Sequence, residues 1–215
     1  MQPTLEPHTR NGTRPQRLFV ALWPPLQVVA GLNSQVQWAR RRLAQAADST
    51  QPIDRLRWIE PEQWHLTLVF LGTVPAATSA DLMGRLAAVA ARHPPATMRF
   101  RGGGCFGNRV IYADVADGRD RITRLATSAR AAARRCGIAI TGGRSQPHVT
   151  LARYRPLARS ADARRLDLQL VVQALADLDG PSWTAEALSL MRSELNAGPH
   201  HRSVYTEVAQ WPLTG

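Results

Sequence analysis

Two stretches of the same pattern decide the fold of this chain: "HLTLVFLG" at residues 65–72 and "HVTLARYR" at residues 148–155. Each begins with a histidine, has a threonine two residues later and continues in apolar residues. Side chains alternate across a β-strand, so the histidine and the threonine of each stretch share one face. The repetition predicts two similar strands, one in each half of the molecule.

The opposite face of each strand is expected to pack in the core. In the first stretch Leu66, Leu68 and Phe70 share that face, which suits a core beneath helices. In the second stretch Val149 and Leu151 occupy the equivalent core-facing positions. Along each strand the histidine and the threonine would lie about 6.5 Å apart. If the two halves of the molecule face each other, two imidazoles and two hydroxyls converge on one cleft.

The remaining pattern indicates an α+β protein with mainly antiparallel pairing, because strand candidates come in adjacent pairs between helices. "GGGCFGN" at 102–108 is expected to be a turn. One domain of two similar lobes is predicted over 17–213, after a polar tail at 1–16 that is expected to be disordered. Strands are predicted at 17–24, 54–59, 64–72, 97–101, 109–115, 183–195 and 203–211, and helices at 26–47, 78–92, 118–136 and 160–167.

The charge is strongly positive, with 27 basic residues against 16 acidic ones and a formal net charge of +11. Every basic residue is an arginine, and the chain contains no lysine. The charge favours an anionic partner, and arginine suits bidentate contacts to phosphate; an arginine-rich genome explains the composition equally well. The missing lysine excludes a P-loop lysine, a Schiff-base lysine and a lysine nucleophile that takes AMP from ATP.

Cysteine use and hydropathy set further limits. Cys105 and Cys136 cannot form a structural zinc site alone, and we expect buried free thiols. No apolar run reaches the roughly 18–20 residues of a membrane span. The first sixteen residues lack the apolar core of a secretory signal. We therefore expect a cytoplasmic protein, monomeric and without a membrane partner.

Two imidazoles and two hydroxyls around one cleft suit chemistry at a phosphate diester. Histidine titrates near pH 6.5, so one ring can be neutral while the other is charged. The neutral ring takes a proton from the attacking oxygen, and the charged ring gives one to the leaving oxygen. Zinc is the alternative for two histidines, but neither strand supplies an obvious third ligand. A half-buried structural histidine explains one copy of the pattern better than it explains two.

The paired motifs resemble the two H-x-T-L motifs of the two-histidine (2H) phosphoesterases, and within them those of the bacterial RNA 2′,3′-cyclic phosphodiesterase (2′-5′ RNA ligase) family. The resemblance covers about residues 17–213. It implies a bilobal, pseudo-symmetric α+β fold, in which two antiparallel sheets line a central cleft and helices lie outside. Further segments fall in the order of the family: "RLFVALWPP", "RWIEPEQW", "GCFGNRVIYADV", "LSLMRSEL" and "YTEVAQWPL".

The resemblance also implies an activity: metal-independent hydrolysis of 2′,3′-cyclic phosphates, at RNA ends or on nucleotides, to 2′-phosphates, with no cofactor. His65 and His148 would act as acid and base, and Thr67 and Thr150 would bind the phosphate. We assign His148 as the base toward water and His65 as the acid toward the leaving O3′. The expected partner is RNA with a 2′,3′-cyclic phosphate end, or a small cyclic nucleotide.

Two further residues have competing interpretations. The resemblance gives Arg153 a phosphate contact, but strict alternation places it opposite His148, at the position equivalent to Phe70, a core residue. A bulge, the end of the strand or a curled side chain would have to bring Arg153 into the cleft; a surface arginine is the alternative. Phe106 is a candidate to stack on a base, and core packing is the competing interpretation.

Other functions stay open at this point. The same scaffold suits a reversible, ATP-independent 2′-5′ joining of RNA, or another cyclic nucleotide phosphodiesterase. A basic RNA-binding module without activity is the non-enzymatic alternative. Binding alone gives no reason for two copies of His-x-Thr, which argues against that alternative.

Overall fold

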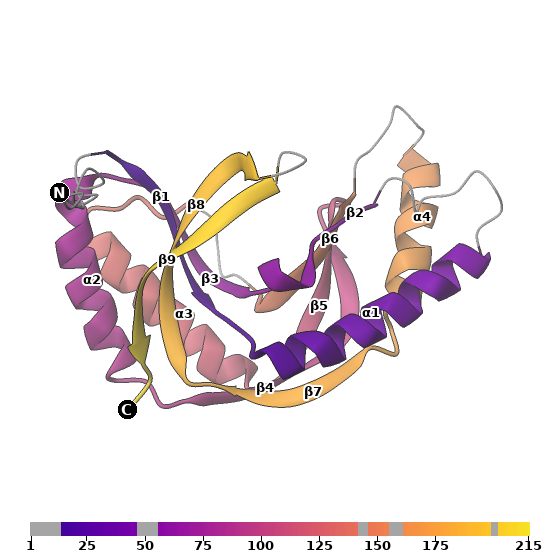
Figure 1. Ribbon diagram of the computed structural model, residues 1–215, viewed down its shortest axis with the longest axis horizontal. Coiled ribbons are helices and arrows are strands. Elements are labelled where there is room, and N and C mark those ends of the chain that lie inside the picture. Colours follow the sequence, from indigo (N-terminus) through magenta and orange to yellow (C-terminus); the bar gives the residue numbers. More distant parts are fainter. Residues whose placement is uncertain (1–13, 47–55, 142–145, 155–160, 199–201) are drawn as a thin grey trace, which may run out of the picture.

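The computed structural model describes residues 14–46, 56–141, 146–154, 161–198 and 202–215 (Figure 1). The predicted disordered tail lies almost wholly outside the described residues, and Gln16 already begins the first strand. The elements, in chain order, are β1 (Gln16–Leu22), α1 (Leu26–Ala46), β2 (Leu56–Trp58), the short 3₁₀ helix η2 (Pro61–Gln63), β3 (Leu66–Val74), α2 (Ala76–Ala90), β4 (Ala96–Phe106), β5 (Val110–Asp117), α3 (Arg119–Arg135), β6 (His148–Tyr154), α4 (Ala161–Ala174), β7 (Asp179–Ala185), β8 (Ala187–Gly198) and β9 (Arg202–Pro212).

The strands form one antiparallel sheet in the order β7-β4-β5-β6-β3-β1-β8-β9, with β2 paired to β6. The two motif strands, β3 and β6, meet in the middle of that order through the pair Leu66 and Val149. The predicted α+β fold with two lobes and helices outside is confirmed. The sheets of the two lobes are joined edge to edge at this one pair.

The helices divide into two pairs, one for each lobe. α2 and α3 pack against each other; α3 also contacts β3, and α2 contacts β8 and β9. α1 and α4 pack together at the other end of the sheet, against β7 and β4 (Figure 1). Because the helices cover the outer face of the curled sheet, the inner face is left for the cleft.

Strand β1 shows how the sequence separates the two faces. Leu18, Val20 and Leu22 face the helices and belong to the main core, where each is at most 2% exposed. Phe19 and Ala21 alternate with them and form a small second cluster on the inner face, with Met191. Burial of apolar area on both faces fixes the register of this strand.

The glycine-rich segment is not a turn as a whole, which corrects the prediction. β4 continues to Phe106, and a three-residue turn, 107–109, leads into β5. Gly107 and Asn108 are the central residues of the turn that the N–H of Arg109 closes on the carbonyl oxygen of Phe106, and both have positive φ, 54° and 53°. A Cβ on Gly104 would collide with the ring of Tyr112, so glycine lets this ring lie over the strand.

The C-terminal strand prediction also needs correction. The segment predicted as one strand at 183–195 contains parts of two strands, which are separated at Glu186. β7 pairs with β4, whereas β8 pairs with β1 and with β9. Among the residues that the structure describes, no helix combines the length and the apolar character needed to cross a bilayer.

Candidate active site

Strand β3 carries a β-bulge next to its threonine. The pairing of β3 with β1 leaves Leu68 without an opposite residue, so Leu68 and Val69 both face the core. Phe70 therefore turns to the inner face, on the same side as Thr67. The prediction of Phe70 as a core residue is wrong: its side chain is 63% exposed, whereas Val69 is 2% exposed.

Strand β6 carries the same bulge at the equivalent place. Its pairing with β5 leaves Leu151 without an opposite residue, so Leu151 and Ala152 both face the core. Arg153 consequently turns to the inner face beside Thr150, where it lines the cleft. A bulge therefore brings Arg153 into the cleft, which is one of the three explanations that the sequence left open.

The junction of β3 and β6 brings the motif residues together. Because the strands run antiparallel through the pair Leu66 and Val149, His65 lies opposite Thr150 and Thr67 lies opposite His148. Diagonal neighbours in such a pairing are separated by about 7–8 Å. The two histidines are diagonal neighbours of this kind, so one phosphate between them could contact both.

Each imidazole is oriented by a backbone carbonyl. Nδ1 of His65 lies 2.7 Å from the carbonyl oxygen of Gln63, and Nδ1 of His148 lies 2.7 Å from that of Gln146. A carbonyl oxygen only accepts, so Nδ1 carries the hydrogen and Nε2 is left to exchange a proton. The repeated pattern is therefore Gln-x-His-x-Thr. Both glutamines stand at the same place in the two stretches of sequence, although the predicted motif began only at the histidines.

The two glutamines are themselves held in place by their side chains. Gln63 donates from Nε2 to the carbonyl oxygen of Ser203 in β9, at 2.7 Å. Gln146 donates from Nε2 to Oδ1 of Asp114 in β5, at 3.1 Å. Each glutamine whose carbonyl orients a histidine is thus tied by its side chain to another strand, which helps to fix the direction of the ring.

His65 is surrounded by aromatic rings. The ring centroids of Phe19, Trp23 and Tyr205 lie 5.0, 5.0 and 5.2 Å from that of His65. Burial lowers the pKa of His65 to about 4; the bond to Gln63 opposes the shift, and the positive charge of His148 adds to it. The imidazole is neutral at pH 7 in the free protein.

His148 has a different neighbour, the carboxylate of Asp114, which lies directly opposite it in the β5–β6 pairing. Burial lowers the pKa of His148, while the bond to Gln146 and the charge of Asp114 raise it and the charge of Arg153 lowers it. Asp114 also accepts from Arg119 through both oxygens, at 2.9 Å. The carboxylate of Asp114 thus favours the charged form of His148, whereas the rings around His65 are aromatic and uncharged.

A cavity of about 490 Å³ opens on the inner face over the motif strands. Of the predicted site residues, His65, Thr67, Thr150 and Arg153 line it, and His148 stands beside it at the strand junction. Two more arginines, an aromatic wall and the β8–β9 hairpin complete the lining; these residues include Arg17, Arg57, Phe70, Thr141, Ser203 and Tyr205.

Phe106 lies away from this lining. Its ring stacks on Tyr112, with centroids 4.0 Å apart and an interplanar angle of 13°, and its edge contacts His148 at 4.9 Å. Tyr112 therefore covers one face of the Phe106 ring, and Phe106 packs against His148. Base stacking by Phe106 stays a prediction.

Two further observations concern metals and thiols. Within the described ranges, no group of three His, Cys, Asp or Glu side chains is arranged to hold a metal ion. Cys105 and Cys136 are free thiols, as predicted, although both are half-buried and not fully enclosed.

Comparison with known proteins shows the family of this chain. The family model of the 2′-5′ RNA ligase superfamily matches residues 41–197. The protein named RNA 2′,3′-cyclic phosphodiesterase from Thermus thermophilus is 32% identical over 211 residues, 93% of this chain and 91% of that protein. The protein of the same name from Aquifex aeolicus is 30% identical over 165 residues, 74% of this chain and 82% of that protein.

Solved structures share the fold. The apo structure of Escherichia coli LigT covers 94% of this chain and 100% of its own, with a TM-score of 0.68 and 22% identity. A structure from Thermus thermophilus covers 93% of this chain and 98% of its own, with a TM-score of 0.68 and 28% identity. Fold and paired motifs together define a two-histidine phosphoesterase. The chain belongs to the 2′-5′ RNA ligase superfamily.

Proposed function

We propose that this protein hydrolyses 2′,3′-cyclic phosphates, at RNA ends or on nucleotides, to 2′-phosphates, without a metal or a nucleotide cofactor. The observation that carries the proposal is the crossed arrangement at the strand junction: His65 faces Thr150, and His148 faces Thr67. The names of the relatives from Thermus thermophilus and Aquifex aeolicus support the same substrate.

The reaction needs one proton acceptor and one proton donor on opposite sides of phosphorus. Water attacks the phosphorus, and its proton passes to Nε2 of the histidine that acts as base. The bond from phosphorus to O3′ breaks, and O3′ takes the proton from Nε2 of the other histidine. The phosphate stays on O2′ and the 3′-hydroxyl is free. Exchange with solvent then returns both rings to their starting states.

The pairing of the two histidines does not decide which of them acts as the base and which acts as the acid. The sequence-based assignment makes His148 the base and His65 the acid. In the free protein, however, Asp114 favours charge on His148, and the aromatic rings around His65 disfavour it. For His65 to act as the acid, the bound phosphate has to raise its pKa, as a nearby negative charge does.

The other cleft residues suit the two ends of the substrate. Hydroxyls of Thr67 and Thr150 and the guanidinium of Arg153 can donate to non-bridging oxygens as negative charge develops. The exposed ring of Phe70 lines the same cavity and offers a flat surface for a base. Phosphate and base would thus be bound at equivalent positions of the two strands.

A second reaction uses the same geometry. If the 5′-hydroxyl of a second RNA replaces water, the attack on phosphorus joins O5′ to the 2′-phosphate and again releases O3′. The description of the matching family as 2′-5′ RNA ligases favours this joining reaction as the alternative. Simple RNA binding without catalysis does not account for two histidines that are oriented in the same way.

The test is an assay of purified protein in EDTA with a panel of 2′,3′-cyclic nucleotides and RNAs with cyclic phosphate ends. We expect turnover in EDTA with a bell-shaped pH profile, and a 2′-phosphate product in phosphorus NMR. Activity lost in EDTA and restored by zinc would reject the metal-free scheme. A 3′-phosphate product would reject the assigned leaving group. Cytoplasmic location and the monomeric state stay predictions.

A further inference from the structure

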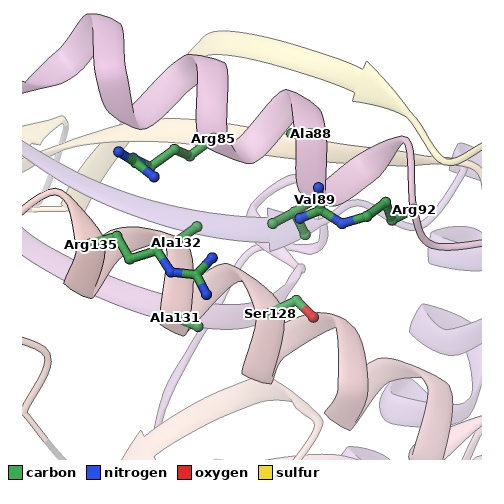
Figure 2. Close-up of a pocket in the computed structure, with 8 residues that line it drawn as sticks. All are labelled: Arg85, Ala88, Val89, Arg92, Ser128, Ala131, Ala132 and Arg135. Atoms are coloured by element: carbon green, nitrogen blue, oxygen red, sulfur yellow. The ribbon is translucent and has the colours of Figure 1, made fainter.

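A basic groove lies on the outer face of one lobe, between α2 and α3 and away from the cleft. Its volume is about 490 Å³. Figure 2 shows the arginine side chains of both helices extending over the gap between them. The floor is made of small side chains, Ala88, Ala131 and Ala132, which leave the guanidinium groups standing around a hollow. Arg85, Arg92 and Arg135 provide the charge.

The charge in this groove is largely unbalanced. Arg85 donates to both oxygens of Asp81, at 3.0 Å each. Arg92 and Arg135 have no acidic partner among the residues that the structure describes, and both are exposed. None of the described residues that line the groove is acidic. Clustered positive charges of this kind repel each other, and an anion between them relieves that repulsion.

A second, smaller hollow of about 170 Å³ continues the groove past the end of α2. Arg121 and Arg124 of α3 line it, together with His93. Nε2 of His93 lies 2.9 Å from Oγ of Ser128, which lines the larger hollow, so the two hollows adjoin. Burial lowers the pKa of His93, and the charges of Arg92 and Arg124 lower it further, which places both arginines close to this ring.

The length of the charged track indicates a polymer. Arg121 and Arg135 are separated by 14 positions of α3, which corresponds to about 21 Å along the helix axis. One phosphate or one nucleotide cannot reach along such a track. A single-stranded nucleic acid carries a charge at every residue and can contact several arginines at once.

The chain also connects this track with the cleft. Arg135 ends α3, and Ala139 and Thr141 follow shortly after it and line the cleft cavity. An RNA strand whose 3′ end lies in the cleft would leave the cleft past Ala139 and Thr141. It would then reach the end of the groove that Arg85 and Arg135 line before the rest of the groove.

We propose that the α2–α3 groove binds the phosphate backbone of the RNA upstream of the end that is held in the cleft. The identity of the ligand rests on the proposed function; the anionic, polymeric character of the ligand rests on the groove itself. The site would make the protein prefer long RNA over mononucleotides without reading the sequence.

The experiment compares two triple variants of equal charge. The groove variant carries Arg92→Gln, Arg124→Gln and Arg135→Gln. The control variant carries Arg41→Gln, Arg101→Gln and Arg134→Gln, three exposed arginines outside the groove, of which Arg134 neighbours Arg135 on α3. Fluorescence anisotropy measures binding of a labelled single-stranded RNA of about 12 nucleotides at several salt concentrations. The RNA ends in a 3′-hydroxyl, so binding is read without turnover.

We expect the groove variant to bind this RNA roughly 10- to 100-fold more weakly than the wild type near 0.1 M salt. The slope of log affinity against log salt should become shallower by about 2, for three lost contacts to a single strand. The control variant should keep most of the affinity. Thermal unfolding of both variants checks that the substitutions leave the fold intact.

Two results would overturn the proposal. Equal losses in the groove and control variants would mean that only net charge matters. An unchanged groove variant would mean that RNA does not use the groove, even if inorganic tripolyphosphate binds there. Because the RNA carries no cyclic phosphate, failure of the protein to hydrolyse cyclic phosphates would refute the proposed function and leave this binding result standing.

Discussion

Phe70 and Arg153 occupy equivalent positions in the two motif strands, although one is aromatic and the other is cationic. Each is the fifth residue after its motif histidine, each follows a bulge that begins at a leucine, and each lines the same cavity. The internal repeat is therefore one of backbone geometry as well as of the His-x-Thr motif. Under the proposed function, these equivalent positions contact two different parts of a nucleotide, Phe70 the base and Arg153 the phosphate.

The bulge in β3 predicts that two nearby residues, Leu68 and Phe70, contribute very differently to stability. Leu68→Ala removes a buried side chain from the core and should cost about 2–5 kcal/mol of unfolding free energy. Phe70→Ala truncates an exposed ring and should change the unfolding free energy by less than about 1 kcal/mol. Urea denaturation of both variants measures the difference. A large loss in the Phe70 variant would place this ring in the core and contradict the register.

Asp114 should support the charged form of His148. Asp114→Asn removes the carboxylate opposite the ring, so the pKa of His148 should fall further below its ordinary value. If His148 is the base, the acidic limb of the kcat/KM profile moves to lower pH as well. NMR titration of the His148 ring measures the shift. Asp117→Asn, an exposed residue of the same strand, is the control and should leave the titration unchanged.

His65 should make the protein less stable in acid. Its pKa is about 4 in the folded protein and 6.5 ordinarily, so the unfolded chain takes up a proton first as the pH falls. The stability that goes with the neutral ring is complete above pH 6.5 and is lost as the pH falls toward 4. The loss amounts to at most about 3 kcal/mol.

Removal of the ring should flatten this dependence. In urea denaturation between pH 7 and about 4, the unfolding free energy of His65→Gln should fall less steeply than that of the wild type. An identical slope in both proteins would mean that the pKa of His65 is not lowered in the folded state.

The leaving group distinguishes the acid from the base. A cyclic phosphorothiolate, in which sulfur replaces O3′, releases a thiolate that needs no proton. If His65 is the acid, His65→Ala should lose about 10²–10⁴-fold on the oxygen substrate and much less on the sulfur substrate. His148→Ala should lose the same factor on both. The reverse pattern would exchange the two roles, in agreement with the electrostatics of the free protein.

The motif residues and most helices and strands could be predicted from the sequence because they depend on local patterns. The helical spacing predicted α1 at 26–47, and the structure has Leu26–Ala46. The face of Phe70 was not legible, because the bulge at Leu68 arises from pairing with β1, far away in the chain. The glycine-rich segment was read as a turn for a similar reason: packing against Leu175 and Tyr112 requires glycine at 103 and 104 within a strand.

The position of Asp114 beside His148 could not be predicted from the sequence for the same reason. Asp114 lies in a strand with ordinary alternation, and nothing near it in the sequence marks it. It becomes part of the site only because the register of β5 and β6 places it opposite His148. By contrast, the glutamines two residues before each histidine were visible as a repeat, and a longer motif would have included them.

The central claim is that His65 and His148 act on one phosphate as a pair. The most direct test measures kcat/KM for a 2′,3′-cyclic nucleotide in EDTA with the wild type, His65→Ala, His148→Ala and the double variant. When two residues act as a unit, the effects of their substitutions on kcat/KM do not add up. Each single variant should therefore lose about as much activity as the double variant. Full activity in either single variant, or losses that multiply in the double variant, would contradict the account.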